Sequence, residues 1–266
     1  MVRRWLLSLA ACLLVILAVP VRANPAPGTE VDLALVIAVD ISYSMDPEEQ
    51  ALQREGFAQA FRSPLVHDAI RRGMLGRIAV AYMEWAGAAD QKVIIPWSVL
   101  DNAESIMAFA DKISAVPLRR AQRTSISGAI DYGVQLLGES GVTAVRQVID
   151  VSGDGANNQG RFVMAARDDA VAKGITINGL PIQLKRPGYL DISDLDEYFR
   201  ECVIGGQGAF MVPVREREQF PQAIKTKILL EIAGSTPSEP LVQKVQAVPR
   251  ADCLIGESQW RDRMGN

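Results

Sequence analysis

The stretch LALVIAVDISYSMDPEE, residues 33–49, decides the fold class of this chain. Its first seven residues are continuously apolar, which is typical of a strand buried on both faces of a sheet. Three oxygen-bearing side chains then follow at alternate positions, Asp40, Ser42 and Ser44. A buried strand that ends in a row of oxygens indicates an α/β sheet with a ligand site at its edge.

The rest of the chain alternates in the same way up to about residue 233. Short apolar runs are separated by amphipathic segments, which predicts a Rossmann-like, doubly wound and mostly parallel sheet with helices on both faces. Expected strands are residues 33–39, 77–83, 92–96, 146–151, 175–180 and 209–213. The clearest helical stripe covers 125–137. Asp46 before Pro47, with Glu49 three residues on, predicts the capped start of another helix.

Residues 1–23 have the features of a secretory signal peptide. Two arginines precede an apolar run, and a small residue, Ala23, offers a cleavage site. An uncleaved membrane anchor fits less well because the run is short and contains Pro20. Lipid attachment at Cys12 is the other alternative, and it leaves a very short apolar region. We therefore expect export, to the periplasm or beyond the cell, without a stable membrane anchor.

After the signal peptide, the pattern divides the chain into three parts. Residues 24–30 form a linker, 31–233 the α/β domain and 234–266 an extended tail, since the tail is rich in proline and has no sustained periodicity. Removing the three arginines of the signal leaves 25 of the 28 basic residues against 31 acidic ones. This acidic balance, with no basic block, excludes nucleic acid as an expected partner.

The exported chain keeps two cysteines, Cys202 and Cys253. In an oxidising compartment, a disulfide that ties the tail to the domain is the favoured interpretation. Two unpaired buried thiols are the alternative, because the sequence does not place the two Cα atoms within bridging distance.

Two later loops are predicted to reach the same sheet edge as Asp40. The loop RRAQRTSIS contributes Thr124 before the striped helix, and VIDVSGDGANNQG contributes Asp154 after a strand. Together with Asp40, Ser42 and Ser44, they make a set of hard oxygen donors that suits Mg²⁺ or Mn²⁺. The single histidine and the few thiols argue against zinc.

In order and spacing, these five positions resemble the metal-ion-dependent adhesion site of von Willebrand factor A domains. The stretches MEWAG, GITINGLPI, VIGGQGAF and KILLEIAG also resemble a little-characterised family of secreted bacterial proteins with this fold. The resemblance implies that Ser42, Ser44 and Thr124 bind the metal through hydroxyls, and that Asp40 and Asp154 act directly or through water. It also implies an open coordination position for the carboxylate of a protein or peptide ligand.

The chain departs from the usual pattern at Gly153, where many such domains have threonine. A degenerate site on a metal-independent scaffold is one alternative function. A Mg²⁺-dependent phosphohydrolase with Asp40 as nucleophile is another, although Ser42 stands where that chemistry wants a second acid. His67, the only histidine, lies far from the strand ends, so we expect no enzyme activity. Asn157 and Asn158 are expected as rim or turn residues, and Trp85 as a core residue.

Overall fold

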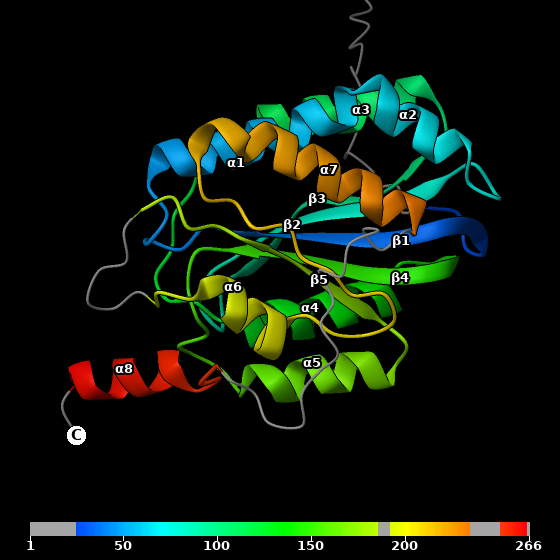
Figure 1. Ribbon diagram of the computed structural model, residues 1–266. Coiled ribbons are helices and arrows are strands. Elements are labelled where there is room, and N and C mark those ends of the chain that lie inside the picture. Colours follow the sequence, from blue (N-terminus) through cyan, green and yellow to red (C-terminus); the bar gives the residue numbers. More distant parts are fainter. Residues whose placement is uncertain (1–24, 186–191, 235–250, 265–266) are drawn as a thin grey trace, which may run out of the picture.

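The computed structural model describes residues 25–185, 192–234 and 251–264 and contains one five-stranded sheet with the order β3-β2-β1-β4-β5 (Figure 1). Its strands are β1 (Thr29–Asp40), β2 (Ile78–Trp85), β3 (Gln91–Leu100), β4 (Val142–Gly153) and β5 (Thr176–Pro181). All neighbouring pairs are parallel except β2 and β3. The connection between these two is too short for a crossover helix, so the chain turns back as an antiparallel edge strand.

The central strand β1 is buried on both faces, as the continuous apolar run predicts. Leu33, Leu35 and Ile37 face one hydrophobic cluster, while the alternate residues Ala34 and Val36 face the other. All five side chains are inaccessible to solvent. Strand β1 therefore lies at the centre of a three-layer molecule.

Helices cover both faces of the sheet (Figure 1). One face carries α1 (Pro47–Arg62), α2 (Pro64–Arg71), α3 (Ala103–Ala115) and α7 (Phe220–Ala233). The other carries α4 (Ile126–Gly138), α5 (Val163–Ala172) and α6 (Leu195–Tyr198), which continues into a π-helical turn, Phe199–Val203. This arrangement confirms the predicted fold class, and α4 confirms the helical stripe at 125–137.

The predicted start of α1 is also confirmed. The side chain of Asp46 accepts a hydrogen bond from the Glu49 backbone N–H at 2.8 Å. The Glu49 side chain accepts one from the Asp46 N–H, also at 2.8 Å. This reciprocal cap satisfies two donors that a helix start leaves free, and it ends the oxygen-rich loop at a defined point.

The expected strand at 209–213 is wrong. This segment runs beside β5 but forms only isolated bridges, between Gly179 and Met211 and between Ile182 and Val214. Pro213 lies between the two bridging residues and has no N–H to donate, which interrupts a regular ladder.

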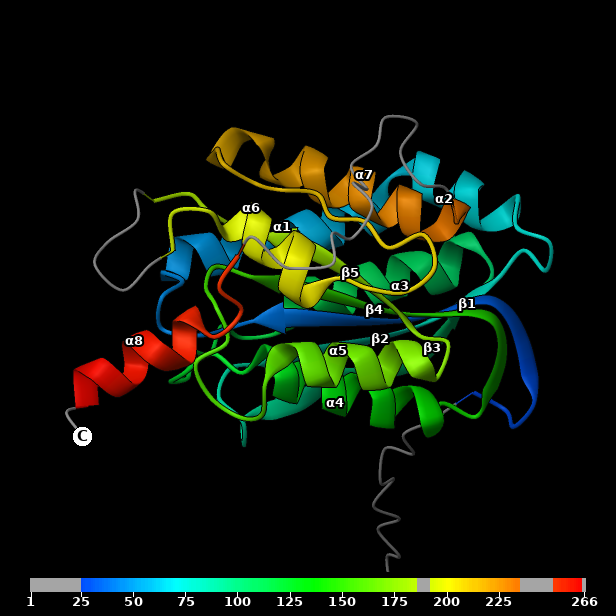
Figure 2. The same ribbon diagram turned by 60° about the horizontal axis from the view of Figure 1, so that its bottom comes forward.

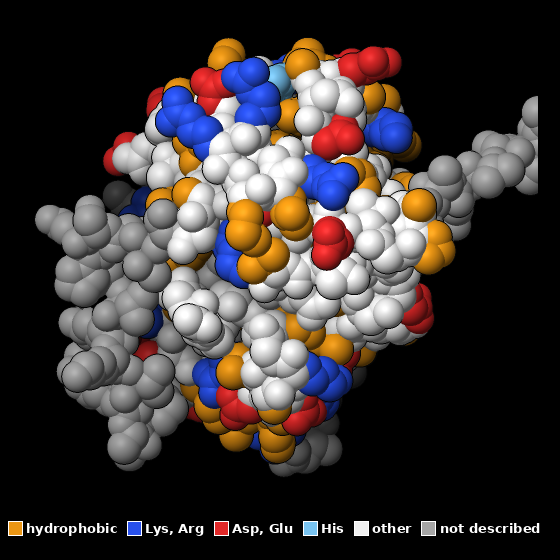
Figure 3. All heavy atoms as spheres, turned by 90° about the vertical axis from the view of Figure 1, so that its right-hand side faces the viewer, with side chains coloured by type: hydrophobic (Ala, Val, Ile, Leu, Met, Phe, Trp, Pro, Cys, Tyr) orange, Lys and Arg blue, Asp and Glu red, His pale blue; other side chains and the backbone are white. Residues whose placement is uncertain are grey.

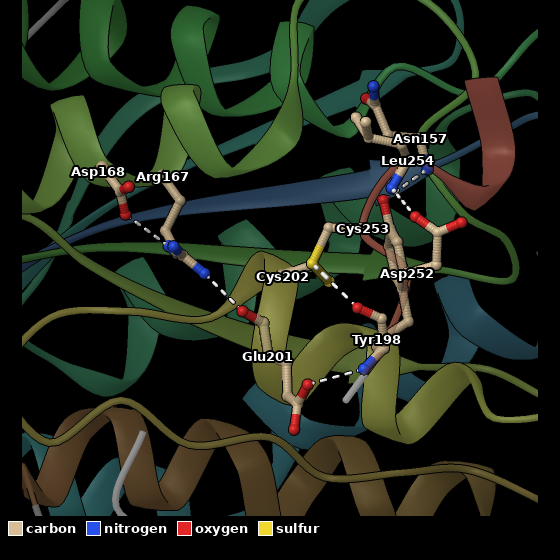
Figure 4. The surroundings of a disulfide bond; sticks show 10 residues. Asn157, Arg167, Asp168, Tyr198, Glu201, Cys202, Asp252, Cys253 and Leu254 are labelled. Carbon is tan, nitrogen blue, oxygen red and sulfur yellow. Dashed lines mark hydrogen bonds and ion pairs between the residues drawn. A yellow bond between two sulfur atoms is a disulfide. The ribbon is translucent and has the colours of Figure 1, made fainter. Parts of the chain in front are cut away.

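The C-terminal segment also differs from the prediction of an extended tail. Its described part ends in the helix α8 (Ile255–Met264), which lies at the end of the sheet to which β1 points (Figure 2). The disulfide is confirmed: Cys202 and Cys253 are bonded, with their Cα atoms 5.6 Å apart (Figure 4). The bond fixes the start of α8 to the turn that follows α6.

The predicted signal peptide, residues 1–23, lies outside the described residues. Within the described residues, no helix has the length and apolar character needed to cross a membrane.

Candidate functional site

The first predicted ligand, Asp40, is the last residue of β1 and is completely buried. Its Oδ1 accepts a hydrogen bond of 2.7 Å from the backbone N–H of Ser42. Its Oδ2 is also buried and has no hydrogen-bond partner among the described residues. A buried carboxylate oxygen is costly unless a donor or a cation satisfies it, so this atom could accept a further hydrogen bond or bind a cation.

Ser42, Ser44 and Asp154 form a chain of oxygens above the end of the sheet. The hydroxyl of Ser44 donates to Oδ1 of Asp154 at 2.6 Å, and the Oγ atoms of Ser42 and Ser44 are 2.8 Å apart. Asp154 directly follows β4, which pairs in parallel with β1. Parallel pairing thus brings these distant parts of the sequence to one edge, as predicted.

Thr124 joins this edge from the loop before α4. Its side chain is almost buried, its N–H donates to Oδ1 of Asn158 at 3.0 Å, and its carbonyl accepts from the Asn158 N–H at 2.8 Å. The buried Asn157 accepts in turn from the N–H of Ser127 at 3.0 Å. The two asparagines therefore do more than turn the chain, because they tie the Thr124 loop to the Asp154 loop.

The electrostatics of the edge follow from two neighbouring carboxylates, of which Asp40 is buried and Asp154 is partly buried. Burial raises the pKa of Asp40 to about 6, against hydrogen bonds from Ser42. Burial, and then the charge of Asp40, raise the pKa of Asp154 well above its usual value. Both shifts come first from desolvation, and at Asp154 the neighbouring charge of Asp40 adds to it.

The donor set fits a small divalent cation. Two carboxylates and three hydroxyls are the oxygen ligands that Mg²⁺ and Mn²⁺ take, with water completing the octahedron. A cation at this position would satisfy Oδ2 of Asp40 and favour the charged form of both acids. No group of three or more His, Cys, Asp or Glu side chains that could hold a metal occurs in the described part of the chain. A site here therefore depends on the hydroxyls.

Gly153, the departure from the usual pattern, lies against the buried acid. A Cβ atom at this position would lie 3.1 Å from Oδ2 of Asp40 and 3.3 Å from the ring of Trp85. Trp85 is completely buried, which confirms it as a core residue. Its ring occupies the space beside the glycine, so a larger residue at 153 would press on the Asp40 carboxylate.

Two further side chains bear on the chemistry. Lys185 donates to the carbonyl of Ser44 at 3.0 Å and to Oε2 of Glu49 at 2.7 Å, so it places a cation on the rim that the sequence analysis missed. His67 lies on α2, and its ring Nε2 is 2.8 Å from the Phe61 carbonyl oxygen. His67 is therefore a helix residue whose side chain has a hydrogen-bond partner.

A cavity of about 500 Å³ adjoins the predicted ligands. Four of the five predicted ligands line it, namely Ser42, Ser44, Thr124 and Asp154. The other side is formed by α8 through Gly256, Gln259, Trp260 and Arg263, which the sequence analysis did not anticipate. The sequence does contain a local signal for the helix α8. A helix dipole is complemented by acidic residues near its start, here Asp252 and Glu257, and by basic residues near its end, here Arg261 and Arg263.

Figure 3 shows the opposite end of the molecule, where basic, acidic and hydrophobic side chains are interspersed on the described residues. The oxygen-lined cavity lies at the other end, where β1 and β4 terminate.

The comparison with known families assigns the chain. A family model described as "Protein of unknown function (DUF1194)" matches residues 30–236. The chain belongs to the DUF1194 family. No curated protein matched this DUF1194 sequence.

Solved structures show that this DUF1194 chain has the von Willebrand A fold. The proximal thread matrix protein 1 of the mussel byssus is 12% identical, with a TM-score of 0.55 over 78% of this chain and 50% of that one. The von Willebrand factor type A structure from Catenulispora acidiphila is also 12% identical, with a TM-score of 0.52 over 79% and 47%. This chain thus spans about half the length of both.

Two further structures bear on the site and on the domain length. The von Willebrand factor domain of the pilus tip protein Mfa5 from Porphyromonas gingivalis is 12% identical, with a TM-score of 0.53 over 79% of this chain and 98% of that one. Another structure of the mussel protein, at a TM-score of 0.51, has a zinc-occupied metal-ion-dependent adhesion site. At these identities, the likeness establishes the fold alone.

Proposed function

We propose that this protein is an exported binding module that holds Mg²⁺ or Mn²⁺ with Asp40, Ser42, Ser44, Thr124 and Asp154. The module presents this cation to an acidic group of a protein or peptide. The observation that carries the proposal is the oxygen chain from Ser42 to Asp154, which lines a cavity. It follows the buried Asp40, whose Oδ2 has no hydrogen-bond partner among the described residues.

The donor set also explains how the module would bind a partner. Mg²⁺ keeps waters that a carboxylate can replace, so a cation held from one side can bridge to a second molecule. The zinc-occupied site of the mussel structure supports a divalent metal at this position of the fold. The signal-like residues 1–23 and the disulfide support an oxidising compartment outside the cytoplasm.

Calorimetric titration of the protein with Mg²⁺ and with Mn²⁺ tests the metal directly. We expect saturable binding of about one cation per chain, because the five donors form one site. Asp154→Ala should abolish this binding, since it removes a carboxylate that the hydroxyl of Ser44 contacts. Asp111→Ala, which removes an exposed acid on α3, is the matched control and should bind as the wild type does.

The same titration distinguishes the alternatives. Equal binding by Asp154→Ala and the wild type would show that the cation lies elsewhere. No binding by the wild type would leave a metal-independent scaffold as the better description of the protein.

A Mg²⁺-dependent phosphohydrolase is the second candidate, and Lys185 is the observation that favours it. This chemistry wants a lysine beside the acid, and Lys185 lies on the rim next to Ser44. Against it, Asp40 is fully buried, and Lys185 is bound to Glu49. Hydrolysis of a generic phosphate ester in Mg²⁺, lost in Asp40→Asn, would establish the enzyme.

A further inference from the structure

The helix α8 is held against the metal-site loops by a disulfide, a side-chain hydrogen bond and a close glycine contact. The disulfide Cys202–Cys253 anchors its start (Figure 4). The side chain of the buried Asn157 donates to Glu257 Oε1 at 2.8 Å. Gly256 packs so closely that a Cβ there would lie 2.2 Å from the Asn157 carbonyl oxygen. Helix α8 therefore packs tightly on these loops and forms one wall of the cavity.

This wall places the aromatic ring of Trp260 in contact with two guanidinium groups. The Cζ of Arg123 lies 3.7 Å from the centre of the Trp260 ring, and the Cζ of Arg263 lies 5.1 Å from it. Arg123 belongs to the loop before Thr124, and all three side chains line the cavity. Stacking of this kind fixes the direction of a guanidinium while leaving its in-plane donors free.

One of the guanidinium donors of Arg123 lacks an acceptor. Its Nη1 is buried and has no hydrogen-bond partner in the described structure. Its backbone is held at φ 76°, a conformation that is costly for a residue with a side chain. Neither Arg123 nor Arg263 forms an ion pair with a described residue. The fold thus holds a strained arginine with an unsatisfied donor in the cavity wall.

The charges define what would fill the cavity. The proposed divalent cation balances the two carboxylates Asp40 and Asp154. The partly buried Arg123 and the exposed Arg263 then keep their positive charges without an ion-pair partner among the described residues. Two negative groups restore neutrality, one as the ligand of the cation and one as the partner of the arginines. A guanidinium binds a carboxylate through paired hydrogen bonds, which makes carboxylates well suited to both positions.

On this basis, and resting on the proposed metal site, we infer that the cavity binds a ligand with two carboxylates. One carboxylate binds the metal, and Arg123, Trp260 and Arg263 bind the other. The cavity is of the size that small ligands and peptide segments fill. An acidic peptide with two carboxylates one residue apart is the ligand we favour. A free dicarboxylic acid offers the same chemistry.

Calorimetry in saturating Mg²⁺ tests this inference with defined probes. The acetylated, amidated tripeptide Asp-Gly-Asp should bind at least tenfold more tightly than Asp-Gly-Asn, because a charge-assisted pair is lost in the second. Glutarate, a free dicarboxylic acid, is the small-molecule probe. Tighter binding of the peptide identifies a peptide as the source, whereas tighter binding of glutarate identifies a free acid.

Variants then assign the second carboxylate. Arg263→Gln and Arg123→Gly should each weaken Asp-Gly-Asp about tenfold and remove its advantage over Asp-Gly-Asn, while Mg²⁺ affinity stays unchanged. Glycine suits the positive φ at 123. Arg261→Gln is the matched control on the same helix, since Arg261 bonds Ser258 and does not line the cavity.

The outcomes separate this inference from the proposed function. A protein that binds Mg²⁺ but shows no preference for the diacid, or binds neither probe, overturns the inference and leaves the metal site standing. Variants at 123 and 263 that bind like Arg261→Gln overturn it as well. If the protein binds no divalent cation, the proposed function itself is wrong.

Discussion

Lys227, on α7, holds its ammonium group in the core between two carboxylates. Its Nζ lies 2.9 Å from Asp150 on β4 and 2.7 Å from Glu231 on the same helix, and all three side chains are at most 1% exposed. Glu231 also accepts from Asn178 of β5 at 2.7 Å. A buried charge of this kind needs its partners, so these residues join α7 to the sheet.

The pKa values of these groups show how burial and the neighbouring charges act against each other. Burial acts to lower the pKa of Lys227, but the attraction of Asp150 and Glu231 outweighs it and raises the pKa. Burial raises the pKa of Asp150 to about 7 from 3.8, although the charge of Lys227 opposes the rise. A raised acid pKa means that the folded state binds this proton more tightly than the unfolded state does. The protonation of Asp150 therefore contributes to the free energy of unfolding in full below about pH 4. This contribution is lost as the pH rises through 7.

Lys227→Met should therefore lower the free energy of unfolding by about 3–5 kcal/mol near neutral pH, because it leaves two buried carboxylates without a cation. Without Lys227, the folded pKa of Asp150 rises further, so the loss should be larger at pH 8 than at pH 5. Urea unfolding at the two pH values measures both effects.

Lys225→Met is the control for this substitution, since Lys225 lies on the same helix and is partly exposed. A loss as small as that of Lys225→Met, or one that does not depend on pH, would contradict the assigned role of Lys227.

At the scale of elements, α8 and the metal-site loops depend on each other through one close contact. Gly256 lies against the backbone carbonyl of Asn157, and the Asn157 side chain reaches both Ser127 and Glu257. The first turn of α8 thus packs on the loop that carries Asp154. A side chain at 256 must push the helix away from this loop.

Gly256→Ala should undock α8 while the disulfide keeps it attached to the domain. The added Cβ would lie 2.2 Å from the Asn157 oxygen, which no backbone adjustment of a few tenths of an ångström relieves. Hydrogen exchange of residues 255–263 should become faster, and exchange in β1 should stay slow. Cys253→Ser should have the same effect on α8 by removing its anchor.

Gly138→Ala is the matched control, because a Cβ at 138 meets no atom within 4 Å. Unchanged exchange over 255–263 in Gly256→Ala would show that the close contact does not hold the helix.

At the scale of the whole molecule, three loops and a C-terminal helix meet at one end of a sheet whose body is otherwise conventional for the fold (Figure 2). The buried acid Asp40 ends β1 and the partly buried Asp154 directly follows β4, so the sheet positions both. Any cation that binds only this assembled edge must stabilise the folded state as a whole.

Thermal unfolding should accordingly depend on the metal. Mg²⁺ at a hundred times its dissociation constant should add about 2.7 kcal/mol to the free energy of unfolding relative to chelator. Asp154→Ala should show no such rise. Identical curves for the wild type with chelator and with Mg²⁺ would argue for a degenerate site.

The sequence by itself determined the layers of this protein and the positions of the predicted ligands. Apolar periodicity is a local property, and it separates buried strands such as β1 from amphipathic helices such as α4. Parallel strands all present their carboxyl ends at one edge, so Asp40 and Asp154 could be placed together without coordinates. The cap at Asp46 was equally local.

Only the tertiary structure decided what surrounds that edge. The position of α8 depends on a disulfide and on one glycine contact across some hundred residues, and neither has a periodic signal. The unsatisfied donor of Arg123, the rim position of Lys185 and the buried charge of Lys227 arise from packing between elements. Such contacts join residues far apart in the chain, so their energies are set by the fold and not by neighbours in sequence.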